Sequence, residues 1–491
     1  MAIGGSYKEM QKHIPKHIHE IAQKLEDKDF EVFVVGGSVR DLLLGKLPKD
    51  WDLTTDALPV DVMELFPDGK SNNDFGTVLL PIRNEQGVSE EIVEITTYRS
   101  EQGYTDRRHP DVIQFEKDLE LDLARRDFTV NAMALRVIHE SEIVDIFGGQ
   151  KDVNKKIVRA VGEPTDRFKE DALRMLRAVR FSCQLGFEIE PKTERAILKM
   201  AGTIKFVSTE RIREELIKIL ESDHPYEGIM SLHRLKLLNY ILPELERGLG
   251  VMQNHHHVYD IFKHNVLSLK YCPSKDWRVR LAALLHDVGK VQVKRIINGE
   301  ATFYNHEYVS AKIAQKICKR LKFSLKDEDK VVALVKNHMF YYNVGEVTAS
   351  SVRRLLVKTG KENLQDLIHV RIADRLGSGV KKGKPYKLRH LEYMLEKVQH
   401  DPVSVKDLKL NGDELMQYLD IKPSPKIGQI FDVMLAEVIE DPELNTKEQL
   451  LKRSKELNEI NLEDLRRKAK EAIEEKRVED DNELKKDFHV N

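Results

Sequence analysis

The sequence predicts an α+β fold in which a small mixed head of β-strands and short helices precedes a long helical body. Up to Gly149, short apolar runs interrupted by glycine alternate with short helical patterns. From about residue 160 onward, nearly every apolar run has the spacing of a helix. The 491 residues are enough for several domains with sizeable cores, and 33% of them are charged.

Changes in these patterns divide the chain into four expected parts. Residues 1–150 form the head, which opens with a helical stretch at residues 1–30. Residues 151–245 form a helical neck, residues 246–400 a second helical domain, and residues 401–491 a helical C-terminal region. Within the last part, residues 452–486 are rich in Lys and Glu, which predicts an exposed helix or a loosely ordered tail.

The head begins with a pattern that suits a phosphate-binding turn. Residues 31–35 form a short apolar run typical of a strand, Gly36 and Gly37 interrupt it, and residues 38–44 have helical spacing. Glycines let backbone N–H groups approach an anion closely, and the helix N-terminus and Arg40 add positive potential. A Gly-Gly turn alone is weak evidence, so its neighbours decide its meaning.

Three acidic residues follow this turn: Asp50, Asp52 and, inside an apolar run, Glu94. Residues i and i+2 of a strand face the same side, so Asp50 and Asp52 can converge on the same cations, with Glu94 on a neighbouring strand. Magnesium prefers hard oxygen ligands and shares them with substrate phosphates. The triad could hold two metal ions during in-line displacement at a phosphate. The alternative for a lone Asp-x-Asp is a solvated acidic turn.

Two further segments carry dense polar residues. RRDFTVN (residues 125–131) enters an apolar stretch, and residues 170–180 are strongly helical. On that predicted helix Asp171, Arg174 and Arg177 share one broad face. An acceptor beside a donor complements cytosine or adenine, where an exocyclic amino group adjoins a ring-nitrogen acceptor, and does not complement uracil or guanine. The alternative is an ordinary surface ion pair.

With these motifs in this order, the chain closely resembles the bacterial tRNA nucleotidyltransferases, the CCA-adding enzymes of the class shared with bacterial poly(A) polymerases. One departure is SNND (71–74), which stands before FGTV where the family usually has a glycine-containing approach. The matching motifs extend over most of residues 20–450: GGSVRD (36–41), DWD (50–52), EITTYR (94–99), YTDRRHP (104–110), RRDFTVN (125–131), EDALR (170–174) and NGD (411–413).

The resemblance implies an enzyme that adds C, C and A to the 3′ end of tRNA from CTP and ATP without a nucleic-acid template. Asp50 and Asp52 would bind Mg²⁺, and Glu94 would help to activate the tRNA 3′ hydroxyl. Residues 101–115 resemble the loop linked in this family to the switch from CTP to ATP. The residues implied in nucleotide binding are Gly36, Gly37, Arg40 and Arg177, then Arg126, Asp127 and Asn131 for the ribose and phosphates, and Asp171 with Arg174 as the amino-acid template.

A second set of candidate metal ligands lies in the middle of the chain: His264, His286, Asp287 and Asp374. Histidines and carboxylates on successive helices suit a divalent cation such as manganese, nickel or magnesium. Their order resembles the HD phosphohydrolase superfamily, which implies phosphatase or cyclic phosphodiesterase activity and repair of damaged tRNA ends. The alternative is a structural role, and a structural or solvent-facing role is favoured for the nearby His255, His256, His257, His306 and His338.

The composition is compatible with an RNA partner. The net charge is only −2, so contacts to phosphates must come from local clusters. Arg107, Arg108 and KKGKPYKLR (381–389) are candidates, and Tyr386 could stack on a base, although such runs are also typical of solvated loops.

Cysteine usage and the lack of long apolar runs predict a cytoplasmic protein. The three cysteines are widely spaced and form no paired motif, which favours a reducing compartment. No stretch approaches 18 apolar residues, and the N-terminus lacks a signal-peptide core. We therefore expect no membrane insertion or export, while the sequence does not predict the oligomeric state.

The sequence is compatible with three functions. The first is CCA addition, which the complete set of motifs and the intact loop favour. The second is an enzyme that adds only part of the CCA sequence or only A: an A-adding specialist or a bacterial poly(A) polymerase. The basic segment that marks many bacterial poly(A) polymerases is not evident in this sequence. The third is an HD-type phosphohydrolase or RNA-binding protein with an inactive head. The presence of Asp50, Asp52, Asp171 and Arg174 argues against it.

Overall fold

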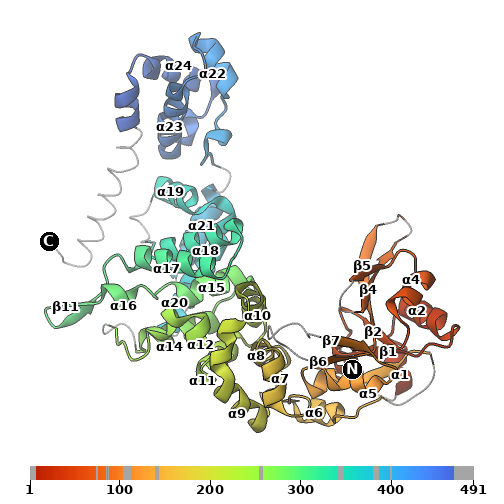
Figure 1. The fold of residues 1–491 in the computed structure, drawn as a ribbon. Helices are drawn as coiled ribbons and strands as arrows, with labels where there is room; N and C mark the ends of the chain where they lie inside the picture. The colour runs from red at the N-terminus through yellow and green to blue at the C-terminus, as the bar shows by residue number, and fades with distance from the viewer. Residues whose placement is uncertain are drawn as a thin grey trace. The chain divides into compact units, whose positions relative to one another are not determined.

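The computed structural model describes residues 7–72, 76–84, 86, 88–102, 112–138, 143–253, 258–340, 348–379, 386–398 and 401–468. The chain divides into two compact units: Met1–Arg247 with Ile317–Phe323, and Gly248–Lys316 with Ser324–Asn491. The first unit holds a β-sheet head and a helical neck, and the second is almost entirely helical (Figure 1). The α+β class is therefore confirmed, while the boundaries of the four expected parts stay a prediction.

A six-stranded mixed sheet organises the head, with strand order β3-β4-β5-β2-β1-β8. β2 runs parallel to β5, and the other neighbouring strands are antiparallel. The expected first strand is present as β1 (Val32–Val35), and it is buried along its whole length between β2 and β8. Helices α2 and α4 pack against each other and against the sheet (Figure 1).

The elements of the head follow one another closely. A separate two-stranded antiparallel sheet, β6 with β7, joins the two ends of the predicted nucleotide-switching loop, whose middle, residues 103–111, lies outside the described residues. The bounds are α1 Tyr7–Gln11, α2 Lys16–Glu26, α3 Gly37–Leu43, β2 Asp52–Thr55, α4 Pro59–Leu65, β3 Lys70–Asn72, β4 Thr77–Arg83, β5 Ser89–Thr97, β6 Arg99–Gln102, β7 Val112–Phe115, α5 Leu119–Ala124, β8 Ala134–Arg136 and α6 Gly149–Lys155.

The neck is a bundle of short helices in which α8 packs against α10 and α11. A two-stranded parallel sheet of β9 and β10 lies at its start. The bounds are β9 Ile157–Val158, α7 Pro164–Glu170, α8 Arg174–Leu185, β10 Glu188–Ile189, α9 Pro191–Met200, α10 Thr209–Glu221, α11 Pro225–Arg234, α12 Leu238–Ile241 and α13 Pro243–Glu246.

The prediction of one continuous helix over residues 170–180 is wrong. α7 ends at Glu170 and α8 begins at Arg174, with Asp171 in an extended conformation (φ −142°, ψ 106°) between them. The Asp171 carboxylate accepts a hydrogen bond from the backbone N–H of Leu173 at 3.0 Å. A short acidic side chain that bonds its own backbone in this way competes with the helix, which explains the break.

The second unit contains the helices that carry the predicted HD residues. α14 lies against both α15 and α20, and Gly377 of α20 allows a close crossing: a Cβ there would stand 2.9 Å from Ser268 N and 3.0 Å from His264 O. The bounds are α14 Ile261–Lys270, α15 Trp277–Leu285, α16 Lys290–Val293, β11 Arg295–Ile297, β12 Glu300–Thr302, α17 His306–Arg320, α18 Leu325–Asn337, α19 Ala349–Thr359, α20 Leu364–Gly377 and α21 Tyr386–Val398.

The last helices, α22 (Gly412–Leu419), α23 (Pro425–Glu440) and α24 (Lys447–Asn458), form an apolar core of their own. The part of the predicted tail beyond residue 468 lies outside the described residues. Among the helices that the structure describes, none combines the length and the apolar character needed to cross a bilayer.

Candidate functional site

The structure brings two of the three predicted acidic residues of the head together on adjacent strands. Asp52 is the first residue of β2, and it lies directly opposite Glu94 of the parallel strand β5. Asp50 lies two residues before the strand and is exposed, so strand alternation does not place it, contrary to the prediction. Its position is fixed instead by Ser38 of α3, whose hydroxyl donates to the Asp50 carbonyl oxygen at 2.9 Å.

These carboxyl groups influence one another's protonation. Burial raises the pKa of Asp52, and the negative charge of Asp50 raises it further, while Arg126 opposes both effects. Burial also raises the pKa of Glu94, with Asp52 and Asp50 adding to the effect. Carboxylates that repel each other in this way favour a bound cation, because a divalent ion removes the repulsion. The donor set, all carboxylate oxygen, fits Mg²⁺.

The Gly36 turn keeps the space beside this acidic pair open. Gly36 has φ 75° and ψ −131°, a conformation that residues with a side chain rarely adopt. A Cβ there would stand 3.1 Å from Nη1 of Arg126 and 3.8 Å from Oδ2 of Asp52. The turn therefore needs glycine for two reasons, its backbone angles and the nearby guanidinium and carboxylate. The helix predicted for residues 38–44 is present as α3, which begins one residue earlier, at Gly37.

Asp122 positions Arg126, and the sequence reading missed it. Its fully buried carboxylate accepts hydrogen bonds from Arg126 Nη2 at 3.2 Å, from Arg125 Nε at 2.9 Å and Nη2 at 2.6 Å, and from the Thr54 hydroxyl at 3.3 Å. Burial alone would raise the pKa of Asp122, but the two arginines outweigh it and hold the pKa below its usual value. The i+3 and i+4 spacing of the arginines from Asp122 was the available signal.

A second polar network joins the remaining head residues to α8. Arg40 donates to Asn131 Oδ1 at 2.6 Å, and Asn131 donates to Asp127 Oδ1 at 3.3 Å. Arg177 of α8 donates through Nε to Asp127 Oδ2 at 2.7 Å. The guanidinium groups of Arg40 and Arg177 both lie over the ring of Phe181, at 5.5 and 5.4 Å. Four of the predicted nucleotide-binding residues are thus connected in one network.

The predicted template residues do not pair with each other through their side chains among the described residues. Asp171 accepts two hydrogen bonds from Arg211 of α10, at 3.2 and 2.7 Å. Arg174 donates to Glu170 Oε2 at 2.6 Å and to the carbonyl oxygen of Arg125 at 3.0 Å. Arg211 is 40 residues from Asp171 in sequence, and nothing in the local pattern pointed to it.

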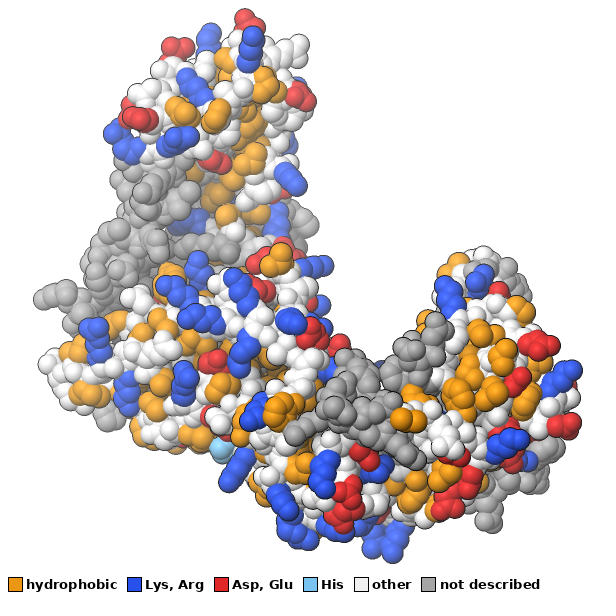
Figure 2. Space-filling model, in the orientation of Figure 1, with side chains coloured by type: hydrophobic (Ala, Val, Ile, Leu, Met, Phe, Trp, Pro, Cys, Tyr) orange, Lys and Arg blue, Asp and Glu red, His pale blue; other side chains and the backbone are white. Residues whose placement is uncertain are grey.

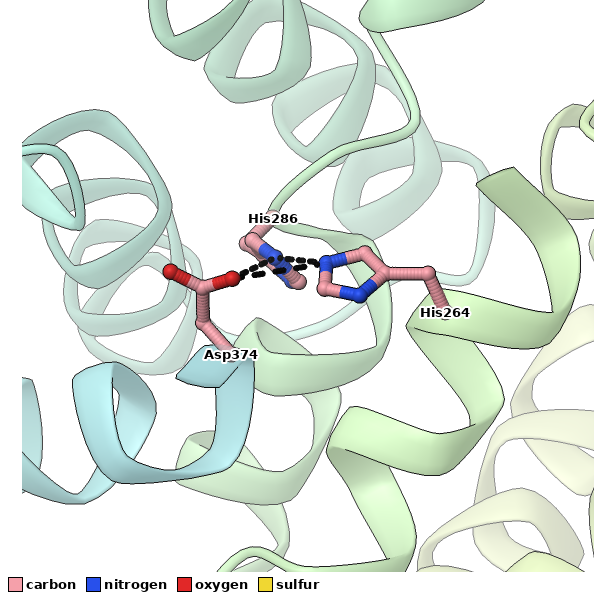
Figure 3. Close-up of side chains that lie close together, drawn as sticks. All are labelled: His264, His286 and Asp374. Carbon is pink, nitrogen blue, oxygen red and sulfur yellow. Dashed lines mark hydrogen bonds and ion pairs between the residues drawn. The ribbon is translucent and has the colours of Figure 1, made fainter. Parts of the chain in front are cut away.

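The second unit brings all four predicted HD residues together. His264 lies on α14, His286 and Asp287 follow the end of α15, and Asp374 lies on α20. Nε2 of His264 is 3.0 Å from Nε2 of His286, 3.1 Å from Asp287 Oδ2 and 3.4 Å from Asp374 Oδ1. Figure 3 shows the two imidazoles and the Asp374 carboxylate pointing toward one another from three segments. His264, His286 and Asp374 have the proximity needed to hold one cation.

Both negative and positive charges surround this cluster. Burial would lower the pKa of His286, but Asp287 and Asp374 outweigh it and raise the pKa to about 10. Nη1 of Arg371 forms an ion pair with Oδ2 of Asp374 at 2.8 Å, and Nζ of Lys290 forms one with Oδ2 of Asp287 at 2.6 Å.

Two of the histidines for which a structural or solvent-facing role was favoured also belong to this cluster. His306, at the start of α17, and His338, at the end of α18, are both buried, so the solvent-facing alternative is wrong for them. Their Nε2 atoms lie 3.1 and 3.6 Å from Asp287 Oδ1. Sequence spacing alone could not place them, because they lie on two further helices. The other three, His255 to His257, are outside the described residues, as are Arg107, Arg108 and residues 381–385.

Three family models match the chain in succession. They describe a poly A polymerase head domain at residues 32–159, a probable RNA and SrmB-binding site of polymerase A at residues 186–249, and an HD domain at residues 249–378. The first match covers the mixed sheet with the Asp52–Glu94 pair and the Gly36 turn. The fold and this site together define a nucleotidyltransferase.

Similar proteins show to which family of nucleotidyltransferases the chain belongs. An A-adding tRNA nucleotidyltransferase from Deinococcus radiodurans is 33% identical over 412 residues, which cover 81% of this chain and 89% of the relative. A CCA-adding enzyme from Pediococcus pentosaceus is 33% identical over 428 residues, 86% of this chain and 92% of that enzyme. The chain belongs to the tRNA nucleotidyltransferase family. The crystal structure of the Bacillus stearothermophilus CCA-adding enzyme with CTP is 26% identical, with a TM-score of 0.66, over 90% of this chain and 97% of that one.

Proposed function

We propose that this protein completes the 3′ end of tRNA by adding C, C and A in order from CTP and ATP. The observation that carries the proposal is the register of β2 and β5, which sets Asp52 opposite Glu94 beside the Gly36 turn and Arg126. The match to a CCA-adding relative over 86% of the chain supports it. An A-adding relative is equally identical, so A-only addition is the principal alternative.

Each residue of the head has a distinct task in this mechanism. Asp50 and Asp52 would hold two Mg²⁺ ions, and Glu94 would assist deprotonation of the tRNA 3′ hydroxyl. When bound, the ions supply positive charge for the triphosphate and for the attacking oxygen. Arg126 faces Asp52 across the Gly36 turn, where it can bind a phosphate oxygen without a steric clash. The Asp127–Asn131–Arg40 network would orient the ribose and phosphates from the other side.

Base selection would require Asp171 and Arg174 to exchange their present partners for the edge of the incoming base. Arg211 and Glu170 then act as placeholders that hold the two side chains in position between additions. Arg174→Ala should loosen the choice of nucleotide, and so should Arg211→Ala, while Arg213→Ala on the same helix is the control. Strict selection of CTP and ATP by both variants would refute the template proposal.

The output of the enzyme can be tested directly. Purified protein and Mg²⁺ would be incubated with tRNA transcripts ending before CC, after C and after CC, with each nucleoside triphosphate singly and with CTP and ATP together. Ordered growth to CCA that then stops is the expected result. Addition of A only to the CC-ended transcript would indicate an A-adding enzyme, and long A tails a poly(A) polymerase. Asp52→Ala should abolish addition while tRNA binding persists, whereas Asp68→Ala, an exposed aspartate of the same head, should be active.

We also propose a second activity, hydrolysis of phosphate esters at damaged tRNA ends, at the cluster formed by His264, His286, Asp287 and Asp374. The observation that favours it is the convergence of their ligand atoms within hydrogen-bonding distance. Transcripts ending in a 2′,3′-cyclic phosphate or a 3′-phosphate would be incubated with Mn²⁺ or Ni²⁺. His264→Ala should lose the release of phosphate and keep CCA addition, and Asp52→Ala should behave in the opposite way. Equal hydrolysis by both variants would refute the assignment.

The contacts to tRNA and the location in the cell stay proposals. On the face shown in Figure 2, Lys and Arg side chains are spread between acidic ones over the described surface. We propose that small basic clusters on several elements share the contact to the tRNA backbone, with salt-dependent affinity. A cytoplasmic location is supported by the three cysteines, all buried and free.

A further inference from the structure

We infer that the 3′-terminal nucleotide of tRNA binds the open face of β5, β4 and β3, beside Glu94. An apolar patch on this face, made of Leu79, Pro81 and Ile92, supports the nucleoside. Lys70, at the edge of the sheet, contacts a phosphate of the same RNA strand. The inference rests on the proposed nucleotidyl transfer and adds to it the residues that position the attacking substrate.

The register of four strands aligns these residues across one face of the sheet. Glu94 of β5 lies opposite Asp52 of β2 on one side and opposite Leu79 of β4 on the other. Leu79 in turn lies opposite Lys70 of β3. Directly opposed residues project from the same face of a sheet, so two acids, a leucine and a lysine form one row. Neighbouring strands are about 4.8 Å apart, so the row extends about 14 Å from its first acid to the lysine.

This face of the sheet is open, while the opposite face belongs to the core of the head. Ile92 lies two residues before Glu94 on β5, directly opposite Pro81 of β4, and it is 56% exposed. α4 packs against β3, β4 and β5. Exposed apolar side chains that are gathered in one place mark interaction surfaces. The residues that alternate with the patch along β4 and β5 are buried: Val78, Leu80, Val93 and Ile95.

The geometry of the reaction favours the attacking tRNA, and not the nucleoside triphosphate, as the occupant of this surface. Val35, the last residue of β1, lies opposite Asp52, and the Gly36 turn follows it. The proposed triphosphate-binding groups, Gly36 and Arg126, therefore lie on the β1 side of Asp52. β4 and β3 lie on the other side of Glu94. The attacking and leaving oxygens lie roughly in line on opposite sides of the phosphorus, so the tRNA 3′ hydroxyl approaches from the β4 side.

The composition of the patch suits a nucleotide that changes between additions. In the proposed reaction, the terminal nucleotide before the first addition differs from the C that follows it. Leu79, Pro81 and Ile92 have no hydrogen-bonding groups in their side chains, so they can cover a base or ribose without reading a base edge. Lys70 is exposed and forms no ion pair among the described residues, which leaves its ammonium group available to a phosphate.

A photocrosslink tests the position without relying on activity. A tRNA transcript that ends before CC, with 4-thiouridine as its terminal nucleotide, would be mixed with the full-length protein and Mg²⁺ in the absence of nucleoside triphosphates. After irradiation, the crosslinked peptide would be identified by mass spectrometry. We expect crosslinks within β4 or β5. Crosslinks confined to other segments, or none at all, would overturn the inference whether or not the protein adds nucleotides.

Kinetic variants test the contribution of each residue in the transcript that ends before CC. Lys70→Ala should raise KM for tRNA roughly threefold to tenfold and reduce the slope of log KM against log salt by about one, as expected for one lost phosphate contact. Ile92→Ser should raise KM for tRNA and leave the salt slope unchanged, because it removes an apolar contact only. KM for CTP should stay the same in both variants. Both side chains are exposed, so we expect both variants to fold like the parent.

Matched controls lie elsewhere on the head. Lys28→Ala changes an exposed lysine that follows α2, and Val60→Ser changes a residue of α4 that is 61% exposed. Neither should change KM for tRNA. Equal effects in test and control variants, or a rise in KM for CTP alone, would overturn the role of the patch and leave the proposed function standing. A parent protein that adds no nucleotide would refute the proposed function, and the crosslink would still decide where the tRNA end binds.

Discussion

Asp122→Asn should impair nucleotide addition because it releases Arg126 from the acidic site. The Oδ1 atom of Asp122 takes both bonds from Arg125, and Oδ2 takes those from Arg126 and the Thr54 hydroxyl. An asparagine can keep its oxygen toward Arg125, which leaves its NH₂ group facing Arg126. Thr54 can adapt by accepting a hydrogen bond, whereas a guanidinium group cannot.

The size of the effect follows from the single bond that is lost. A hydrogen bond to a charged group contributes about 1.5 to 3 kcal/mol. If Arg126 contacts the triphosphate during the reaction, this loss corresponds to roughly a tenfold to hundredfold lower kcat/KM for CTP. The affinity for tRNA should not change, because the substitution is buried within the head.

The assay is steady-state incorporation of CTP into a transcript that ends before CC. Asp152→Asn is a matched control, since Asp152 is also buried and accepts hydrogen bonds from one threonine, Thr129, and one arginine, Arg159. Both variants should lose thermal stability. If Asp122→Asn retained kcat/KM within twofold of the parent while melting as early as the control, the role of Asp122 in positioning Arg126 would be refuted.

Two further predictions concern protonation. Burial opposes ionisation of Asp127, but Arg177 and Arg174 outweigh burial and hold the pKa of Asp127 below its usual value. The interaction of Asp127 with these arginines therefore stabilises the fold above about pH 4. This stabilisation is lost as the pH falls through the lowered pKa. Melting temperatures of parent and Asp127→Asn should therefore differ at pH 7 and converge toward pH 3, and a difference independent of pH would contradict this. Burial raises the pKa of Cys183 and of Cys272 to about 11. Both thiols should react with an aromatic disulfide reagent at pH 8 only after unfolding in guanidinium, and fast labelling of the native protein would exclude the buried placement.

Much of the head could be predicted because its signals are local. The apolar run before Gly36 becomes β1, and the helix after it is present as α3. The placement of Glu94 on a strand beside Asp52 was also expected, and the parallel register makes them direct neighbours. Short-range patterns of this kind depend only on residues a few positions apart.

The partners of the charged residues could not be predicted, because they are distant in sequence. Asp171 pairs with Arg211, 40 residues away, and this contact accompanies the break between α7 and α8. Aspartate is common at the start of a helix, so Asp171 within a helical pattern was the overlooked signal of the break. In the same way, the positions of His306 and His338 beside Asp287 depend on how α17 and α18 pack against the segment after α15. Helical spacing carries no information about this packing.

The close crossing of α14 and α20 makes the proposed metal site at His264, His286 and Asp374 sensitive to residues that touch none of these side chains. A Cβ at Gly377 would stand 2.9 Å from Ser268 N and 3.0 Å from His264 O, which both belong to the backbone of α14. The methyl group of an alanine at position 377 would therefore force the two helices apart. Asp374 lies on α20 less than one turn before Gly377 and would move with it, away from His264. Ligand distances in metal sites are expected to lie within about 0.2 Å of their standard values. A substitution as small as one methyl group, at a position with no polar atom in its side chain, would therefore abolish the proposed hydrolytic activity and leave nucleotide addition by the head unchanged.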